Sequence, residues 1–179
     1  MQRVPPAGTP PQSKDAMKTL SHLYTRFAAL ASHLQSPLLL AVRLYWGWQF
    51  AQTGWGKLHN LAHVTSFFAS LNIPFPAFTT CFIASLEFFG GILLILGLGT
   101  RFIGLLLACN MFVAYYTADH AALVSILSDP GKFYAADPFT FLFAALLLLI
   151  FGPGLFSADA LILRSLPRSA PPHANIAKA

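Results

Sequence analysis

Residues 77–98 read AFTTCFIASLEFFGGILLILGL, an apolar run with one charged residue, Glu87, near its centre. A run of this length is what an α-helix needs to cross the ~30 Å hydrocarbon core of a bilayer. A charged side chain at that depth costs roughly 2.5–3.5 kcal/mol on insertion scales, so it usually faces a bundle interior and has a partner. The stretch therefore predicts a membrane-spanning helix that carries a buried polar site.

The composition of the whole chain supports a membrane protein. Hydrophobic residues make up 56% of its 179 residues and charged residues only 9%, whereas a soluble domain typically carries about 25% charged residues. The formal charge of +5 is spread over short segments that flank apolar runs, which is the pattern of membrane topology. Because the basic residues do not cluster on one polar segment, we expect the lipid bilayer as a partner and no nucleic acid.

Three further apolar runs accompany the first. One begins at Ser36-Pro37, which we interpret as a helix cap followed by a first-turn proline, and continues to about Lys57. The others extend from Arg101 to about Thr117 and from Asp137-Pro138 to Gly152. Most Lys and Arg residues outside the runs then fall on the side of the two termini, so the positive-inside rule places both termini in the cytoplasm. The sequence predicts an all-α fold, a four-helix transmembrane bundle in a bacterial-type cytoplasmic (inner) membrane.

The N-terminal region differs from the apolar runs. Residues 1–14 are rich in proline and polar residues, which is typical of disorder. From Ala16 to Leu34 apolar residues recur every three or four positions, which predicts an amphipathic helix lying on the membrane interface, or alternatively on a partner subunit. We therefore expect three parts: a disordered tail plus interfacial amphipathic helix at 1–36, a membrane domain at 37–160 and a cytoplasmic tail at 161–179.

Two linkers carry structure of their own. Residues 61–71 show a helical stripe of apolar side chains, and residues 118–136 contain an apolar piece that is too short to span a bilayer. We expect both linkers to lie at the outer interface as caps over the bundle.

The spacing of polar residues indicates which of them can meet. At about 100° per residue, Arg43 and Lys57 share one narrow face of the first span. Glu87 and Asn110 should both lie near the midplane. We expect these four residues to form a buried polar site with Arg43 as the main partner of Glu87, either as a structural pair or as a site for a proton or polar ligand. The face of Arg43 also holds glycines at which a neighbouring helix can approach closely: Gly47 and Gly54.

Other side chains give weaker signals. No histidine pair faces the bundle interior, which argues against a haem, and we expect no metal site. Cys81 and Cys109 lie at different depths, so we expect free thiols. Aromatic rings suit a flat ligand such as a quinone; the alternative is that they lie at the membrane interface and between packed helices. A carboxylate beside an imidazole can tune the charge of the imidazole. The candidate ligand-lining residues are Trp46, Phe50, Tyr115, Asp119 and His120.

Taken in order along residues 38–162, the motifs resemble those of the DoxX family. They are Arg43-x3-Gly47-x2-Phe50-x3-Gly54-x2-Lys57-Leu58, Ile73-Pro74-x-Pro76, Glu87-x2-Gly90-Gly91, Thr100-Arg101, Met111-x-Val113-Ala114 and Gly152-Pro153-Gly154-x2-Ser157-x-Asp159. The resemblance implies a small four-helix integral membrane protein associated with membrane redox chemistry, since a subunit of a thiosulfate:quinone oxidoreductase gives the family its name. It also implies that Arg43, Lys57 and Glu87 are the family's charged positions, but it does not establish a catalytic role for any of them.

Two classes of function follow. The first, which the resemblance favours, is an integral membrane subunit of a quinone-linked oxidoreductase or redox-stress complex, in which the buried polar site binds quinone or handles its proton. Such a subunit has no intrinsic cofactor and needs a membrane or peripheral redox protein as partner. Whether the chain is itself catalytic and whether it forms a homo-oligomer both stay open. The second class is a non-catalytic membrane scaffold or small-molecule permease.

Overall fold

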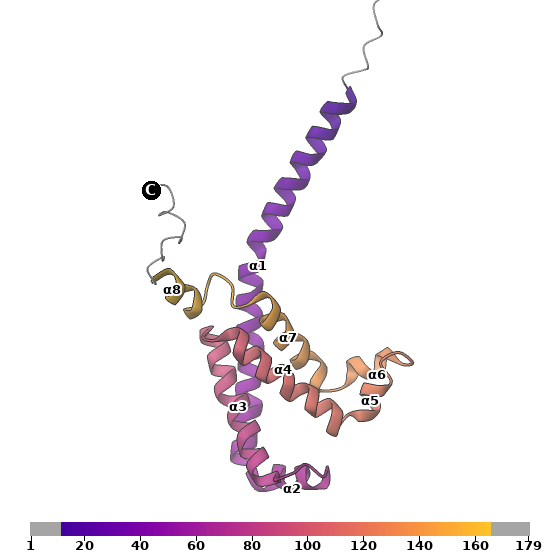
Figure 1. The fold of residues 1–179 in the computed structure, drawn as a ribbon, viewed down its shortest axis with the longest axis vertical. Coiled ribbons are helices and arrows are strands. Elements are labelled where there is room, and N and C mark those ends of the chain that lie inside the picture. The colour runs from indigo at the N-terminus through magenta and orange to yellow at the C-terminus, as the bar shows by residue number, and fades with distance from the viewer. Residues whose placement is uncertain (1–11, 166–179) are drawn as a thin grey trace, which may run out of the picture. The chain divides into compact units, whose positions relative to one another are not determined.

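The computed structural model describes residues 12–165. Within this range the regular elements are eight α-helices, so the all-α class is confirmed. In chain order (Figure 1) they are α1 (Gln12–His59), α2 (Leu61–Ser70), α3 (Pro76–Leu96), α4 (Thr100–Thr117), α5 (His120–Val124), α6 (Pro130–Ala135), α7 (Pro138–Phe151) and α8 (Ala158–Ser165). The predictions for residues 1–11 and 166–179 lie outside the described residues.

Helix α1 continues through Pro37, so the predicted helix start at Ser36 is wrong. Proline holds φ near −65° in the first turn and in a helix interior alike, and in the interior it costs a hydrogen bond without forbidding the helix. The Ser36 hydroxyl oxygen does not cap α1 and instead accepts a hydrogen bond from the Leu155 backbone N–H at 3.4 Å. At this point of the chain two compact units meet, Met1–Gln35 and Ser36–Ala179.

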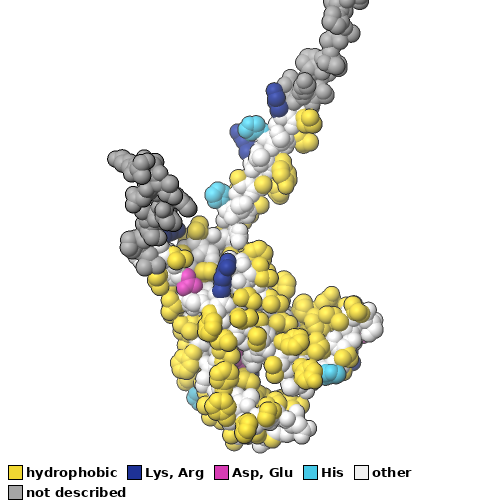
Figure 2. All heavy atoms as spheres, in the orientation of Figure 1, with side chains coloured by type: hydrophobic (Ala, Val, Ile, Leu, Met, Phe, Trp, Pro, Cys, Tyr) yellow, Lys and Arg dark blue, Asp and Glu magenta, His cyan; other side chains and the backbone are white. Residues whose placement is uncertain are grey.

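Two helices are long and apolar enough to cross a membrane, α1 over Met17–His59 and α3 over Pro76–Leu96. Helix α7 is apolar but has 14 residues, and α4 has 18. Figure 2 shows hydrophobic side chains over much of the visible surface of the second unit. Exposed hydrophobic side chains of this unit include the rings of Phe82, Phe89 and Phe112. Apolar surface of this extent is expected where a protein contacts lipid.

Within the second unit, α1 and α3 pack backbone to backbone along a seam of glycines. A Cβ built on Gly47 would lie 2.9 Å from the Gly91 carbonyl oxygen, and one on Gly91 would lie 2.5 Å from the Ala51 nitrogen. A Cβ on Gly54 would overlap the backbone nitrogen of Phe88. Small residues at such a seam allow the close packing that holds membrane helices together. The predicted close approach at Gly47 and Gly54 is confirmed.

Helix α4 packs against both α3 and α7. Leu94, Leu107 and Leu148, one from each of these helices, are fully buried in one hydrophobic cluster. A Cβ on Gly104 would lie 3.1 Å from the Ala145 carbonyl oxygen, so α4 and α7 also meet at close range. This core fixes the face of α4 that is presented to α3.

The turn between α3 and α4 is tight and is held from the C-terminal side. Gly97 has φ +69°, and Leu98 N donates to Leu93 O at 3.0 Å, which is the Schellman ending of a helix. The Asp159 carboxylate accepts hydrogen bonds from the backbone N–H groups of Gly99 at 2.8 Å and Thr100 at 3.0 Å. A carboxylate at this position satisfies otherwise unpaired donors at the start of α4.

Candidate functional site

A buried ion pair joins α1 to α3. The Lys57 ammonium donates to both carboxylate oxygens of Glu87, Oε1 and Oε2, at 2.6 Å each. From α4, Asn110 Nδ2 donates to Glu87 Oε1 at 2.9 Å. Glu87 is 1% exposed and the Lys57 side chain 31% exposed. The three residues form one cluster, named here the Lys57–Glu87–Asn110 cluster, in which the carboxylate is fully enclosed and the ammonium is reachable from one side.

The sequence explains why these residues meet. Glu87 lies on the face of α3 that includes Gly91, and that face is buried. Lys57 lies in the last turn of α1, and the long stem of a lysine lets its ammonium reach a partner far from its own backbone. Short hydrogen bonds between charged groups are roughly twice as strong as neutral ones, which offsets part of the cost of burying the carboxylate.

The predicted pairing of Arg43 with Glu87 is wrong. The Arg43 guanidinium, which is buried, binds four backbone carbonyl oxygens. Arg43 Nε donates to Leu94 O at 2.8 Å and Nη2 to Ile95 O at 2.9 Å. Arg43 Nη1 donates to Pro153 O at 2.7 Å and to Phe156 O at 2.8 Å.

Arg43 does not pair with Glu87 because the two residues lie at different depths in the bundle, although Arg43 is on the expected face of α1. Arg43 and Lys57 do share a face, but 14 positions at 1.5 Å rise separate them by about 21 Å along α1. Arg43 is therefore level with the C-terminal end of α3, where unpaired carbonyls carry partial negative charge. Gly97 leaves the space that the guanidinium fills, because a Cβ there would overlap Arg43 Nη2. Arg43 thus holds α1, the end of α3 and the segment before α8 together.

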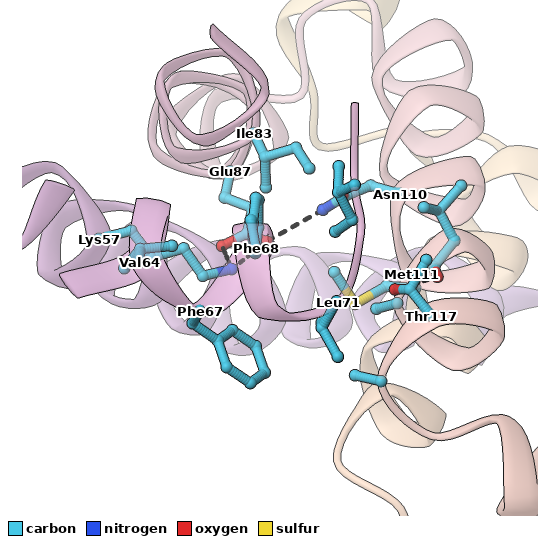
Figure 3. A pocket seen from close by; sticks show the side chains of 14 residues that line it. Lys57, Val64, Phe67, Phe68, Leu71, Ile83, Glu87, Asn110, Met111 and Thr117 are labelled. Atoms are coloured by element: carbon cyan, nitrogen blue, oxygen red, sulfur yellow. Dashed lines mark hydrogen bonds and ion pairs between the residues drawn. The ribbon is translucent and has the colours of Figure 1, made fainter. Parts of the chain in front are cut away.

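An apolar cavity of about 240 Å³ lies against the Lys57–Glu87–Asn110 cluster (Figure 3). One wall comes from α2 and the loop after it, and the other from α4. The cluster supplies the polar part of a lining that is otherwise almost entirely apolar. Apolar side chains of the lining include Val64, Phe67, Phe68, Leu71, Ile73 and Ile83.

A second cavity, of about 270 Å³, borders the same ion pair. Lys57, Glu87, Met111 and Ala114 line both cavities. The second one is completed by Thr53 from α1 and by residues at the start of α7: Asp137, Pro138 and Phe141. The ion pair therefore forms part of a wall between two spaces, and the second space has a further carboxylate, that of Asp137, in its lining.

The cluster has hydrogen-bonding capacity to spare. An ammonium has three N–H donors, and Lys57 uses two of them on Glu87. Within residues 12–165 the Asn110 side-chain oxygen has no hydrogen-bond partner, while its amide nitrogen is fixed by the carboxylate. A ligand in the apolar cavity could therefore meet one donor and one acceptor side by side, an arrangement suited to the carbonyl or hydroxyl group of an otherwise apolar molecule.

The five residues predicted to line a ligand site do not line either cavity. Trp46 and Phe50 pack edge-on against Phe141, with ring centroids 5.3 Å and 4.8 Å away. The fully buried Tyr115 donates its hydroxyl hydrogen to Phe133 O at 2.8 Å and stacks on the Phe133 ring. Phe50 and Tyr115 are buried in the hydrophobic core and Trp46 is half-buried, so these aromatic residues pack between helices, the alternative stated for them.

The last two predicted lining residues lie at the junction of α4 and α5. Asp119 precedes α5 without a side-chain capping bond, and the His120 ring meets the Tyr116 ring edge-on with centroids 5.7 Å apart. In residues 12–165 no group of three or more His, Cys, Asp or Glu side chains gathers in a way that could hold a metal ion. Cys81 and Cys109 are free and exposed.

Sequence reasoning missed the α2 wall of the apolar cavity. The stripe of apolar residues from Leu61 to Leu71 predicted a cap over the bundle, and α2 does pack on α3. Nothing in the stripe itself showed that Phe67 and Phe68 face the cavity beside Glu87. The signal was the combination of a charged midpoint in one helix with an apolar linker helix directly before it.

Comparisons with known proteins give one family match and one relative. Residues 38–120 match the DoxX family model, a shorter span than the motifs suggest. A protein of Bacillus subtilis (strain 168) named "Putative oxidoreductase CatD" is 29% identical over 117 residues, covering 57% of this chain and 86% of that protein. No solved structure matches the chain. With the apolar helices α1 and α3 and this family match, residues 38–120 of the chain are assigned to the DoxX family of membrane proteins.

Proposed function

We propose that this DoxX protein is an integral membrane subunit of a quinone-linked oxidoreductase or redox-stress complex, with a membrane or peripheral redox protein as partner. The family and the oxidoreductase name of the Bacillus subtilis relative support this class. The chain crosses the cytoplasmic (inner) membrane four times in this proposal, with both termini in the cytoplasm.

The four spans are α1 from Ser36 onward, α3, α4 and α7. At 1.5 Å rise per residue the 18 residues of α4 cover about 27 Å and the 14 of α7 about 21 Å. Both are shorter than the ~30 Å hydrocarbon core, and thinning of the bilayer around short helices can make up the difference. An even number of spans puts the basic flanks of both termini on one side, as the positive-inside rule requires.

The observation that carries the proposal is the Lys57–Glu87–Asn110 cluster at the end of an apolar cavity. The cavity suits a single flat ring: Phe67 and Phe68 offer aromatic wall, and the cluster offers one donor and one acceptor for a ring oxygen. Lys57 would donate to that oxygen and Asn110 would orient it, while Glu87 holds the Lys57 ammonium in place. A bound quinone would supply the two-electron, two-proton chemistry.

Copurification from native membranes tests the proposal, with lipid extraction and optical spectra of the isolated protein. We expect bound quinone or a redox partner with the wild-type chain, and about a tenfold lower quinone content in Glu87→Gln. Phe68→Ala, which enlarges the cavity without changing the ion pair, should also lower the quinone content. Lys132→Met, a change on the exposed helix α6, is the matched control and should keep the wild-type content.

A second candidate function is a small-molecule permease or a scaffold. The observation that favours a permease is the wall that the two cavities share at the ion pair, because a path across the protein needs such a gated division. Wild-type protein without quinone or partner, together with quinone-dependent electron flow that is unchanged in Glu87→Gln, would support this second function.

A further inference from the structure

The N-terminal surface helix, defined here as residues 17–35 of α1, carries large apolar side chains that are exposed on the first unit. Seven of them are 61–70% exposed. They are Met17, Leu20, Leu23, Tyr24, Phe27, Leu30 and Leu34. Burying so much apolar surface is strongly favourable, so this face is expected to have an occupant.

The helix is two-faced. At about 100° per residue the seven apolar side chains fall within an arc of about 140°. Lys18, His22, Arg26 and His33 fall within an arc of about 80° on the opposite side. Figure 2 shows this division, with hydrophobic side chains along one side of the helix and Lys, Arg and His along the other.

The charge of the N-terminal surface helix indicates which partner its apolar face binds. Residues 17–35 contain no Asp or Glu, so every fully charged side chain of the helix is basic. A wide apolar face with basic residues on the polar face is typical of helices that lie in the headgroup region of anionic membranes.

A second copy of the helix fits less well. The apolar residues can be written as a heptad repeat, but the positions beside the seam hold Leu23, Leu30, Ser21 and Ala28. Coiled coils commonly place opposite charges there to choose a partner. We therefore propose that α1 bends at Pro37, next to the boundary of the two units, and that the N-terminal surface helix docks on an anionic lipid surface, with its apolar face in the boundary between headgroups and acyl chains and with Lys18 and Arg26 near lipid phosphates.

Limited trypsin digestion of the full-length protein tests this proposal, because trypsin cleaves after Lys18 and Arg26. The protein is placed as one copy per nanodisc, in discs of phosphatidylcholine alone or of phosphatidylcholine with phosphatidylglycerol. Each basic side chain near an anionic surface favours docking by about fivefold, so cleavage at these two sites should slow by about 25-fold in the anionic discs. Raising the salt concentration should reverse much of the protection.

Two matched variants separate docking from other effects. Leu20→Asn with Phe27→Asn disrupts the apolar face and should abolish the protection, whereas Thr25→Asn with Ala29→Asn changes the polar face and should keep it. Equal cleavage rates in the two kinds of disc would overturn the proposal. So would protection that persists in the Leu20/Phe27 variant, or protection that requires two copies of the chain in one disc.

Discussion

Arg43 and Lys57 are two cations on one face of α1, and their surroundings differ in kind. Arg43 ends among backbone carbonyls at one end of α3, where four hydrogen bonds leave it little capacity for a ligand. Lys57 ends on a carboxylate between two cavities and keeps a donor in reserve. A buried charge in a membrane helix therefore does not by itself mark a functional site. The partner of the charge determines its role. Backbone carbonyls that bind a cation anchor the fold, whereas a carboxylate beside a cavity can exchange its cation partner for a ligand.

Removing Arg43 should have the largest effect on stability. Arg43→Met removes four hydrogen bonds to buried carbonyl oxygens, of which Leu94 O keeps the Gly97 N–H as a donor at 3.0 Å, so we expect a loss of about 3–5 kcal/mol in unfolding free energy. Unfolding in mixed detergent micelles measures this, with Arg101→Met as the matched control at about 0.5 kcal/mol. Arg43→Lys, which keeps the charge but not the planar fork of donors, should recover only part of the loss. Equal stabilities of Arg43→Met and Arg101→Met would show that Arg43 is not an anchor.

Removing one partner of the Lys57–Glu87 ion pair should cause the next largest loss of unfolding free energy. Lys57→Met or Glu87→Gln alone should cost about 2–4 kcal/mol, because one buried group is left without its partner. The double variant should lose less than the sum of the two. In a control double-mutant cycle of Arg43 and Glu87, the two losses of unfolding free energy should add within about 0.5 kcal/mol, since Arg43 and Glu87 do not contact each other. Strong coupling in that control cycle would restore the Arg43–Glu87 pairing that the structure rejects.

The glycine seam that lies between the two cations predicts an intermediate effect. Gly54→Ala places a Cβ on the α3 backbone and should cost about 1–3 kcal/mol by forcing the helices apart. Gly56→Ala, two residues away with nothing within 4 Å of its Cβ position, should stabilise α1 by about 0.5–1 kcal/mol. Thermal unfolding of both variants checks the opposite signs. A neutral Gly54→Ala would mean that α1 and α3 are not in contact at this level.

The smallest effect is expected at Asp159. Asp159→Ala removes the acceptor of the Gly99 and Thr100 N–H groups at the start of α4, which should cost about 1 kcal/mol. Asp159→Asn, which keeps an oxygen acceptor, should cost less. Denaturant midpoints measured in the same detergent compare the two. A loss as large as that of Arg43→Met would make Asp159 a partner of the Arg43 anchor and not a helix cap.

The helices were largely predictable and the contacts between buried polar residues only partly so. The ends of α3, α4 and α7 lie within a few residues of the apolar runs, because proline and glycine mark them. The helical projection correctly placed Arg43 and Lys57 on one face. It could not choose between them as the partner of Glu87, because angular position carries no information on depth relative to an antiparallel helix.

The lining of the apolar cavity was predicted less well for a related reason. Aromatic residues such as Phe50 and Tyr115 suit a ligand site and a packed core equally, so their type alone could not separate the two. The structure puts both of them in the core, and the cavity wall comes from α2, a linker helix. Tertiary packing of a connecting segment is the feature that periodicity within one helix cannot report.

The order in which the ribosome makes the chain gives the Arg43 anchor a further meaning. Two of its carbonyl partners, Pro153 and Phe156, lie 110 and 113 residues later in the sequence. At about 5–20 residues per second, these two carbonyl groups are synthesised roughly 5–20 s after Arg43. Until then the guanidinium has only the two carbonyl partners at the end of α3, Leu94 O and Ile95 O, and the Nη1 donors lack theirs. A chain whose synthesis stops before Pro153 would therefore keep a guanidinium with half of its carbonyl partners missing.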